Sequence, residues 1–385
     1  MARFVINIRL SVLLGTALLI SAISAEAAFA QVSPVAFVYV ASSSMTSTNE
    51  ISAFSASANG QLLPVSGAPF AANVAGGMAA NGAYLFGTNG IDIDSFAVGP
   101  DGALSKVATV NAQQYNGAAC GGPSPLFLDH SGTTLYDVDN YGSQCANNTY
   151  QSFSIESTGQ LKYLGATSAA GPRYSSRLSF IGSDLYGFGA TCYHYAAGIY
   201  GFYRDSSGKL TLSSNNSPMP TAQQENFYCT WLASSDPANH VAISVQQLSG
   251  STWATVGLPQ LATYTADSSG NLTTKSKYSN MPQAAVGSVS DLKMSPSGKL
   301  LAVAGSAGLQ VFHFNGSNPI SHYTGLLTKD EIDQMFWDNS NHLYAISRSA
   351  NKLFVFTITP TSVKQSTGSP YTITSPQSIV VLPKR

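Results

Sequence analysis

The chain has 385 residues, of which 44% are apolar and only 10% are charged, against roughly 25% in an ordinary soluble domain. The 18 basic and 19 acidic side chains leave a net charge of -1, which argues against a nucleic-acid binder, because such a protein presents a basic face. The apolar content is too high for a disordered chain. Gly (34), Tyr (19) and abundant Ser, Thr and Asn are turn and strand residues, so the composition favours an all-β fold.

Residues 1–30 have the features of a signal peptide. Two arginines come before the apolar stretch 10–20, and small residues follow, ending in Ala-Phe-Ala at 28–30. That ending predicts cleavage before Gln31. The alternative is an uncleaved anchor helix, but the apolar stretch is shorter than the roughly 20 residues that span a bilayer. We therefore predict that 31–385 is exported to the periplasm or the cell exterior, with no membrane span after cleavage.

One unit of alternating strands and turns recurs along the rest of the chain. The second strand of the unit begins at Phe37, Tyr84, Leu135, Leu185, Val241, Leu301 and Leu343. Five units end in a Gly-x-Leu turn, at Gly60, Gly102, Gly159, Gly208 and Gly270. Two degenerate copies place Ile320 and Val363 at this point. Repeats of about 40–50 residues with four short strands are typical of propeller blades. A solenoid, the alternative, needs a shorter and more regular period.

These repeats predict an all-β, seven-bladed β-propeller of four-stranded blades over 31–385. The C-terminal strand 378–382 has no blade of its own, and the first unit begins at its second strand. The C-terminal strand is therefore expected to complete blade one as its innermost strand, which closes the ring and leaves no free edge. Without a free edge, we expect a monomer. The blades are expected at 35–70 with 377–383, 76–111, 124–167, 177–214, 229–278, 289–326 and 332–373.

The segment 38–70, VYVASSS…NEISAFSASANGQLLPVSGAPF, resembles the repeat of seven-bladed lactonase-like propellers, the 6-phosphogluconolactonase-like group and its YVTN-repeat relatives. A weaker copy of its ending, Gly-Ser-Pro-Tyr, lies at 368–371. The resemblance implies the propeller fold for the whole mature chain. It also implies opening of a sugar-acid lactone by Arg, His and Glu residues around one mouth of the channel. The family's His-rich inner strand and Asp-x-Gly-x-Asp loop have no counterpart at 229–232 or 243–247, which favours binding over hydrolysis.

The four cysteines are expected to form two disulfides, because an even number in an exported chain indicates bridges rather than free thiols. Cys120 and Cys229 precede inner strands, whereas Cys145 and Cys192 lie between second and third strands. Both kinds of loop share one face of a propeller. We therefore predict Cys120–Cys145 within blade three and Cys192–Cys229 across blades four and five. The chain has no Cys-x-x-Cys spacing, so we expect neither a metal nor another cofactor.

Charged residues that are scarce elsewhere gather on the same face near blades four and five. Arg173 and Arg177 precede blade four, His194 lies in its next loop on this face, and Glu225 precedes blade five. An Arg pair can hold a carboxylate or a phosphate. His194 or Glu225 could act as a general base towards water. The alternative is that these side chains are solvated surface charges, which contribute little.

Three further candidates for ligand contact lie in blades six and seven. Arg348 occupies a loop of blade seven from which it could face blade four across the channel. Asp291 and Asp333 are expected at matching positions near the start of two inner strands, where they could meet a cation or water. Alternatively, each carboxylate accepts hydrogen bonds from backbone N–H groups.

Two functions follow from these features. The first is an exported propeller that binds a small polar ligand, a glycan or a protein around blades four and five without catalysis. The alternative is a lactone hydrolase that works through Glu225 or His194 with Arg173 and Arg177. A surface repeat protein without a pocket is a third possibility. The distinguishing feature is whether the Arg, His and Glu side chains reach one cavity at the channel mouth.

Overall fold

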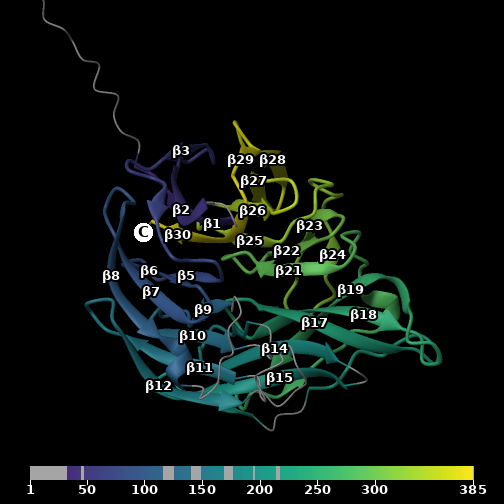
Figure 1. The fold of residues 1–385 in the computed structure, drawn as a ribbon. Helices are drawn as coiled ribbons and strands as arrows, with labels where there is room; N and C mark the ends of the chain where they lie inside the picture. Colours follow the sequence, from purple (N-terminus) through teal and green to yellow (C-terminus); the bar gives the residue numbers. More distant parts are fainter. Residues whose placement is uncertain are drawn as a thin grey trace, which may run out of the picture. The chain divides into compact units, whose positions relative to one another are not determined.

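The computed structural model describes residues 33–44, 47–115, 125–139, 149–168, 177–193, 196–213 and 217–384. The chain divides into two units, Met1–Ser33 and Pro34–Arg385. Every described strand belongs to the second unit, which is a seven-bladed β-propeller (Figure 1). No helix in the described part of the chain is long and apolar enough to cross a membrane.

The first four blades, each from the inner to the outer strand, have these bounds. Blade one contains β30 (Pro376–Pro383), β1 (Ala36–Ser44), β2 (Ser47–Ala56) and β3 (Leu62–Pro64), and β4 (Phe70–Ala71) also pairs with β2. Blade two contains β5 (Met78–Ala80), β6 (Tyr84–Thr88), β7 (Asp92–Val98) and β8 (Leu104–Asn111). Blade three contains β9 (Leu126–Leu128), β10 (Thr134–Asp139), β11 (Thr149–Ile155) and β12 (Leu161–Ser168). Blade four contains β13 (Ser179–Phe180), β14 (Tyr186–Tyr193), β15 (Ala196–Arg204) and β16 (Leu210–Leu212).

The remaining blades follow the same order. Blade five contains β17 (Phe227–Ser235), β18 (His240–Leu248), β19 (Thr255–Ala266) and β20 (Leu272–Thr273). Blade six contains β21 (Val289–Met294), β22 (Leu300–Gly305), β23 (Gly308–His313) and β24 (Ser321–His322). Blade seven contains β25 (Gln334–Trp337), β26 (His342–Ser347), β27 (Lys352–Thr359) and β28 (Ser362–Gln365), and β29 (Tyr371–Thr372) also pairs with β27. Two 3₁₀ turns, Ala112–Tyr115 and Tyr278–Asn280, are the only helical segments in the described residues.

The C-terminal strand closes the ring as the repeats predict. β30 pairs antiparallel with β1, with Val381 opposite Val38, so it is the inner strand of blade one. β30 also contacts the inner strands of the two adjacent blades, β25 and β5. The first and last segments of the propeller unit therefore share one sheet, and the ring leaves no open seam between blades seven and two.

The recurring turn glycines of the repeats join neighbouring blades. Gly102 has φ +90, which a glycine adopts without strain, and a Cβ at this position would lie 2.5 Å from Cδ1 of Phe37 in blade one. The hydroxyl of Tyr39, which is fully buried, donates to the Gly102 carbonyl over 2.9 Å. Tyr136 donates in the same way to Gly208, over 2.8 Å. Each such turn is thus a docking point between two blades as well as the start of an outer strand.

The inner strands are linked to one another by side chains that accept backbone N–H groups. Oγ of Ser179 accepts from Ser235 over 2.7 Å, and Oγ of Ser234 accepts from Met294 over 2.8 Å. A carboxylate oxygen of Asp291 accepts from Met335 over 2.8 Å. These bonds connect blades four to five, five to six and six to seven. Because the inner strands cannot pair with one another as in a sheet, such links hold the channel wall together.

The disulfide prediction is confirmed for one pair. Cys192 in β14 and Cys229 in β17 form a bridge with their Cα atoms 5.2 Å apart, which ties blade four to blade five. Cys120 and Cys145 lie outside the described residues.

Candidate functional site

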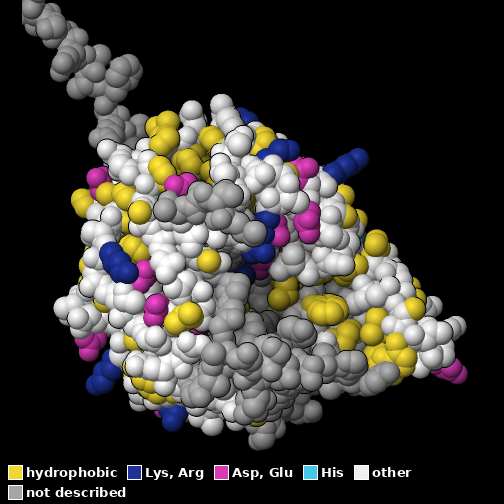
Figure 2. Space-filling model, in the orientation of Figure 1, with side chains coloured by type: hydrophobic (Ala, Val, Ile, Leu, Met, Phe, Trp, Pro, Cys, Tyr) yellow, Lys and Arg dark blue, Asp and Glu magenta, His cyan; other side chains and the backbone are white. Residues whose placement is uncertain are grey.

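Two cavities occupy the centre of the ring. The larger, about 620 Å³, is lined by the middle and the C-terminal ends of the inner strands. The smaller, about 340 Å³, is lined by the beginnings of the inner strands and by the loop that holds Arg348. Leu126, Arg177 and Leu232 line both cavities, so the two spaces meet at these residues. Figure 2 shows basic and acidic side chains side by side near the hollow centre of one face.

A cluster of one acid and two bases lies where the cavities meet. Nη2 of Arg177, which lies two residues before β13, is 3.1 Å from Oδ1 of Asp291 in β21. Nζ of Lys293, two residues further along β21, lies 3.9 Å from the same oxygen. All three residues line the larger cavity. Two cations therefore face one carboxylate, and the cluster carries one excess positive charge when all three groups are ionised.

Asp291 is held by its surroundings. Its side chain is 3% exposed. Oδ2 accepts the Met335 N–H over 2.8 Å, while Oδ1 accepts the Leu292 N–H over 3.0 Å as well as the Arg177 guanidinium. Buried carboxylates need such partners. The carboxylate thus already accepts from donors at both oxygens, and it serves to position the two cations.

Lys293 is the more unusual cation. Its side chain is 23% exposed, and Nζ lies 4.7 Å from the ring centroid of Phe336, in the range of a cation–π contact. Loss of hydration in the channel wall lowers its pKa to about 8; the charge of Arg177 acts in the same direction, and that of Asp291 opposes it. A fraction of this amine is therefore unprotonated near neutral pH.

The structure does not bring all of the residues singled out in the sequence to one place. Arg177 lines both cavities. Glu225 lies on an exposed turn before β17 and lines neither cavity. Arg173 and His194 lie outside the described residues.

Arg348 and Asp333 lie at the smaller cavity but bind each other and the backbone. The Arg348 N–H donates to Oδ2 of Asp333 over 2.7 Å, and its guanidinium donates to the Gln377 carbonyl over 2.6 Å and 3.1 Å. The side chain of Arg348 is 50% exposed. Both residues line the smaller cavity together with Arg177, whereas Asp291 and Lys293 line only the larger one.

The expected match between Asp291 and Asp333 is wrong by one residue. The ladders pair Asp291 with Ala304 in blade six and Gln334 with Ile346 in blade seven, and these two partners occupy the same place in their hairpins. Gln334 is therefore the counterpart of Asp291. Its Oε1 accepts the Ile379 N–H over 2.9 Å, just as Asp291 accepts from Met335. The turn between β21 and β22 hides this relation from the sequence, because it is one residue longer than the turn between β25 and β26: Met294 pairs with Leu301, whereas Trp337 pairs with Leu343.

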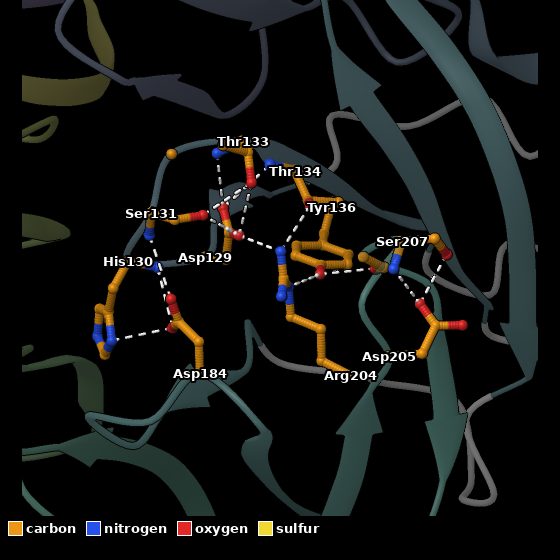
Figure 3. Close-up of polar contacts among 12 residues, drawn as sticks. Asp129, His130, Ser131, Thr133, Thr134, Tyr136, Asp184, Arg204, Asp205 and Ser207 are labelled. Carbon is orange, nitrogen blue, oxygen red and sulfur yellow. Dashed lines mark hydrogen bonds and ion pairs between the residues drawn. The ribbon is translucent and has the colours of Figure 1, made fainter.

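A second polar cluster, at the turn after β9, joins blade three to blade four (Figure 3). The fully buried carboxylate of Asp129 contacts the guanidinium of Arg204 and accepts the Thr133 and Thr134 N–H groups over 2.9 Å and 3.0 Å. Nε of Arg204 also donates to the hydroxyl of Tyr136 over 3.1 Å. Every donor here is directed at Asp129 or its neighbours, so the cluster is a structural joint.

His130 and Asp184 extend this joint to the edge of the larger cavity. Nδ1 of His130 lies 3.0 Å from Oδ1 of Asp184, which also accepts the His130 N–H. This hydrogen bond raises the pKa of His130, partly offset by desolvation. Desolvation raises the pKa of Asp184, but the bonds from His130 and Ser131 outweigh it and lower that pKa overall.

Sequence reasoning missed Lys293. It lies in a strand of otherwise unremarkable composition, and no motif surrounds it. The signal that could have found it is its spacing: Lys293 follows Asp291 by two residues, which places both side chains on one face of an inner strand.

Similarity to known proteins was found at the level of structure. No protein-family profile and no curated protein matches the chain. A candidate 6-phosphogluconolactonase from Bacteroides uniformis superposes with a TM-score of 0.64 at 16% identity, over 90% of this chain and 99% of that one. A periplasmic gluconolactonase from Pseudomonas aeruginosa superposes with a TM-score of 0.62 at 14% identity, over 90% and 99%. At such identities the likeness shows the fold alone: the chain has the seven-bladed β-propeller fold of these lactonase-like structures.

Proposed function

We propose that the protein is an exported β-propeller that binds a small anionic ligand in its central channel. The observation that supports this most directly is the cluster of Arg177, Asp291 and Lys293, in which two cations share one carboxylate beside a cavity of about 620 Å³. Arg177 has further N–H donors besides the one directed at Asp291, and a guanidinium matches the geometry of a carboxylate.

The channel favours a small molecule over a glycan chain or a protein. Its volume falls in the usual range for small-ligand sites, and the residues that converge there come from all seven blades. A ligand that enters it exchanges hydration for charge-assisted hydrogen bonds in a region of reduced dielectric constant, where such bonds are stronger than in bulk water.

Export is part of the proposal. The features of residues 1–30 support it, and so does the Cys192–Cys229 disulfide, because such bridges persist mainly in oxidising compartments. The periplasmic location of one structural neighbour is consistent with it.

Calorimetric titration with gluconate tests the binding site. We expect Arg177→Met to weaken gluconate binding about tenfold or more, because a hydrogen bond to a charged group contributes about 1.5–3 kcal/mol. Lys299→Met is the matched control, since it removes a positive charge from an exposed position on the same blade as Lys293. Equal affinities in the wild type and Arg177→Met, or equal affinity for a neutral methyl glucoside, would contradict the proposal.

A second candidate function is hydrolysis of a sugar-acid lactone, the kind of substrate for which the two structural neighbours are named. In this reaction water attacks the lactone carbonyl, the ring C–O bond breaks, and the released alkoxide takes up a proton. Glu225 lines neither cavity, whereas the unprotonated fraction of Lys293 can accept the proton of the attacking water.

Opening of glucono-δ-lactone, followed by pH-stat, tests this second function. We expect Lys293→Met to lower the rate about 100-fold or more, as is usual when a general base is removed. Glu225→Ala should keep the wild-type rate. No turnover by the wild-type protein would rule out this substrate and leave the binding function untouched; loss of activity in Glu225→Ala would show that the base is not Lys293.

A further inference from the structure

Lys293 lines the larger cavity, and its amine lies in a different environment from those of three lysines whose Nζ has an acidic or carbonyl partner. Nζ of Lys352 lies 2.8 Å from Asp330, and Nζ of Lys106 lies 2.9 Å from Asp94. Nζ of Lys384 donates to the Pro100 carbonyl over 2.7 Å. Lys293, in contrast, has no hydrogen-bond partner for Nζ among the described residues and approaches Asp291 only to 3.9 Å. Its nitrogen is thus available to a molecule in the cavity.

The surroundings of Lys293 are those of a nucleophilic lysine. An amine becomes reactive when it is desolvated or lies beside another cation, because both effects disfavour its protonated form. Phe336 covers one side of Nζ, and Arg177 supplies the second cation on the same carboxylate oxygen. With a pKa of about 8, roughly one amine in ten is unprotonated at pH 7, against fewer than roughly one in a thousand for an ordinary lysine.

We propose that Lys293 forms a reversible imine with small oxo acids, compounds that carry an aldehyde or ketone carbonyl next to a carboxylate. The proposal rests on the anion site proposed above, and adds a covalent step to it. Arg177 and Lys293 approach the same oxygen of Asp291, at 3.1 Å and 3.9 Å. A short ligand can therefore place its carboxylate at the guanidinium and its carbonyl at the amine.

The step needs only the two reactants. The lone pair of the neutral amine attacks the carbonyl carbon, and the new C–N bond gives a carbinolamine. The carbonyl oxygen then leaves as water with the two protons of the amine, and a C=N bond remains. Addition of water to the imine reverses the reaction, so the ligand is held and released without an oxidant or a reductant.

The backbone positions the amine for this step. β21 pairs with β22 through Lys293 and Ala302, and the indole N–H of Trp337 donates to the Lys293 carbonyl over 3.2 Å. The residue is thus fixed from both sides of its strand, by its own blade and by blade seven. From this backbone position the side chain of Lys293 extends to the larger cavity.

Reductive trapping tests the proposal on the intact wild-type protein. The protein is incubated at pH 7 with glyoxylate and cyanoborohydride, which converts an imine into a stable carboxymethyl group, and labelling of each lysine is followed by peptide mass spectrometry. Lys299, exposed on the same blade, is the internal reference. We expect Lys293 to be labelled at least about tenfold faster than Lys299, because burial in the channel wall lowers the pKa of Lys293 and Nζ lines the cavity that receives the ligand.

Propionaldehyde, which lacks the carboxylate, tests the class of ligand. We expect glyoxylate to label Lys293 faster than propionaldehyde, and Arg177→Met to abolish that preference. Labelling of Lys293 no faster than Lys299 overturns the imine proposal, and equal rates with both aldehydes overturn the assignment to oxo acids. Gluconate binding is measured on the same samples: if it persists while Lys293 stays unlabelled, the anion site stands without the covalent step, and if both fail, neither proposal stands.

Discussion

At the scale of single residues, the turn glycines make a prediction about stability. Gly102→Ala should destabilise the protein by about 2–4 kcal/mol, because the new methyl group meets the buried ring of Phe37 and the backbone has φ +90. Gly82→Ala is the matched control: its φ is +99, but nothing lies within 4 Å of the added Cβ, so only the conformational cost of about 1–2 kcal/mol applies. Urea unfolding of both variants measures the difference, and equal losses would show that Gly102 is not an interblade contact.

A second residue-scale prediction concerns pH. Because folding raises the pKa of His130, protonation of this side chain stabilises the folded state. The contribution is complete below about pH 6.5 and is lost as the pH rises through the pKa of His130 in the folded protein. The lowered pKa of Asp184 stabilises the fold above about pH 4, and its contribution is lost as the pH falls further. The pair therefore stabilises most between these limits. We expect Asp184→Asn to lower the melting temperature more at pH 5 than at pH 8.5. The same drop at both pH values would show that the ion pair does not depend on His130 protonation.

At the scale of elements, repeats are easier to predict than the places where they deviate. The Gly-x-Leu turns and the apolar second strands recur because every blade must pack the same way against its two neighbours. They can therefore be counted in the sequence. The turn between β21 and β22 breaks that regularity, because it has one residue more than the turn between β25 and β26, so Asp291 corresponds to Gln334 and not to Asp333 in blade seven. A one-residue shift changes which face of the strand a side chain occupies.

The candidate site depends on the whole ring, and for that reason only part of it could be predicted. Arg177 and Asp291 are 114 positions apart, and they meet because the closed ring directs the inner strands of blades four and six to one channel. The sequence places both residues at the start of an inner strand but does not give the angle between blades. Glu225 seemed to belong with Arg177 because the two lie in neighbouring blades, yet its turn lies away from both cavities.

At the scale of the whole molecule, the entire ring should lose its cooperative folding when its last strand is removed. A chain that ends at Ser375 lacks β30, and β1 then loses the partner that covers its inner edge. The exposed edge, and the apolar side chains that pack against Ile379, Val380 and Val381 in the intact ring, predict aggregation and loss of a single cooperative unfolding transition. Removal of Arg385 alone is the control, since this residue lies beyond Pro383, where β30 ends, and leaves Lys384 in place. Cooperative melting of the longer truncation, measured by circular dichroism, would show that six complete blades and a blade one without its inner strand suffice to hold the channel together.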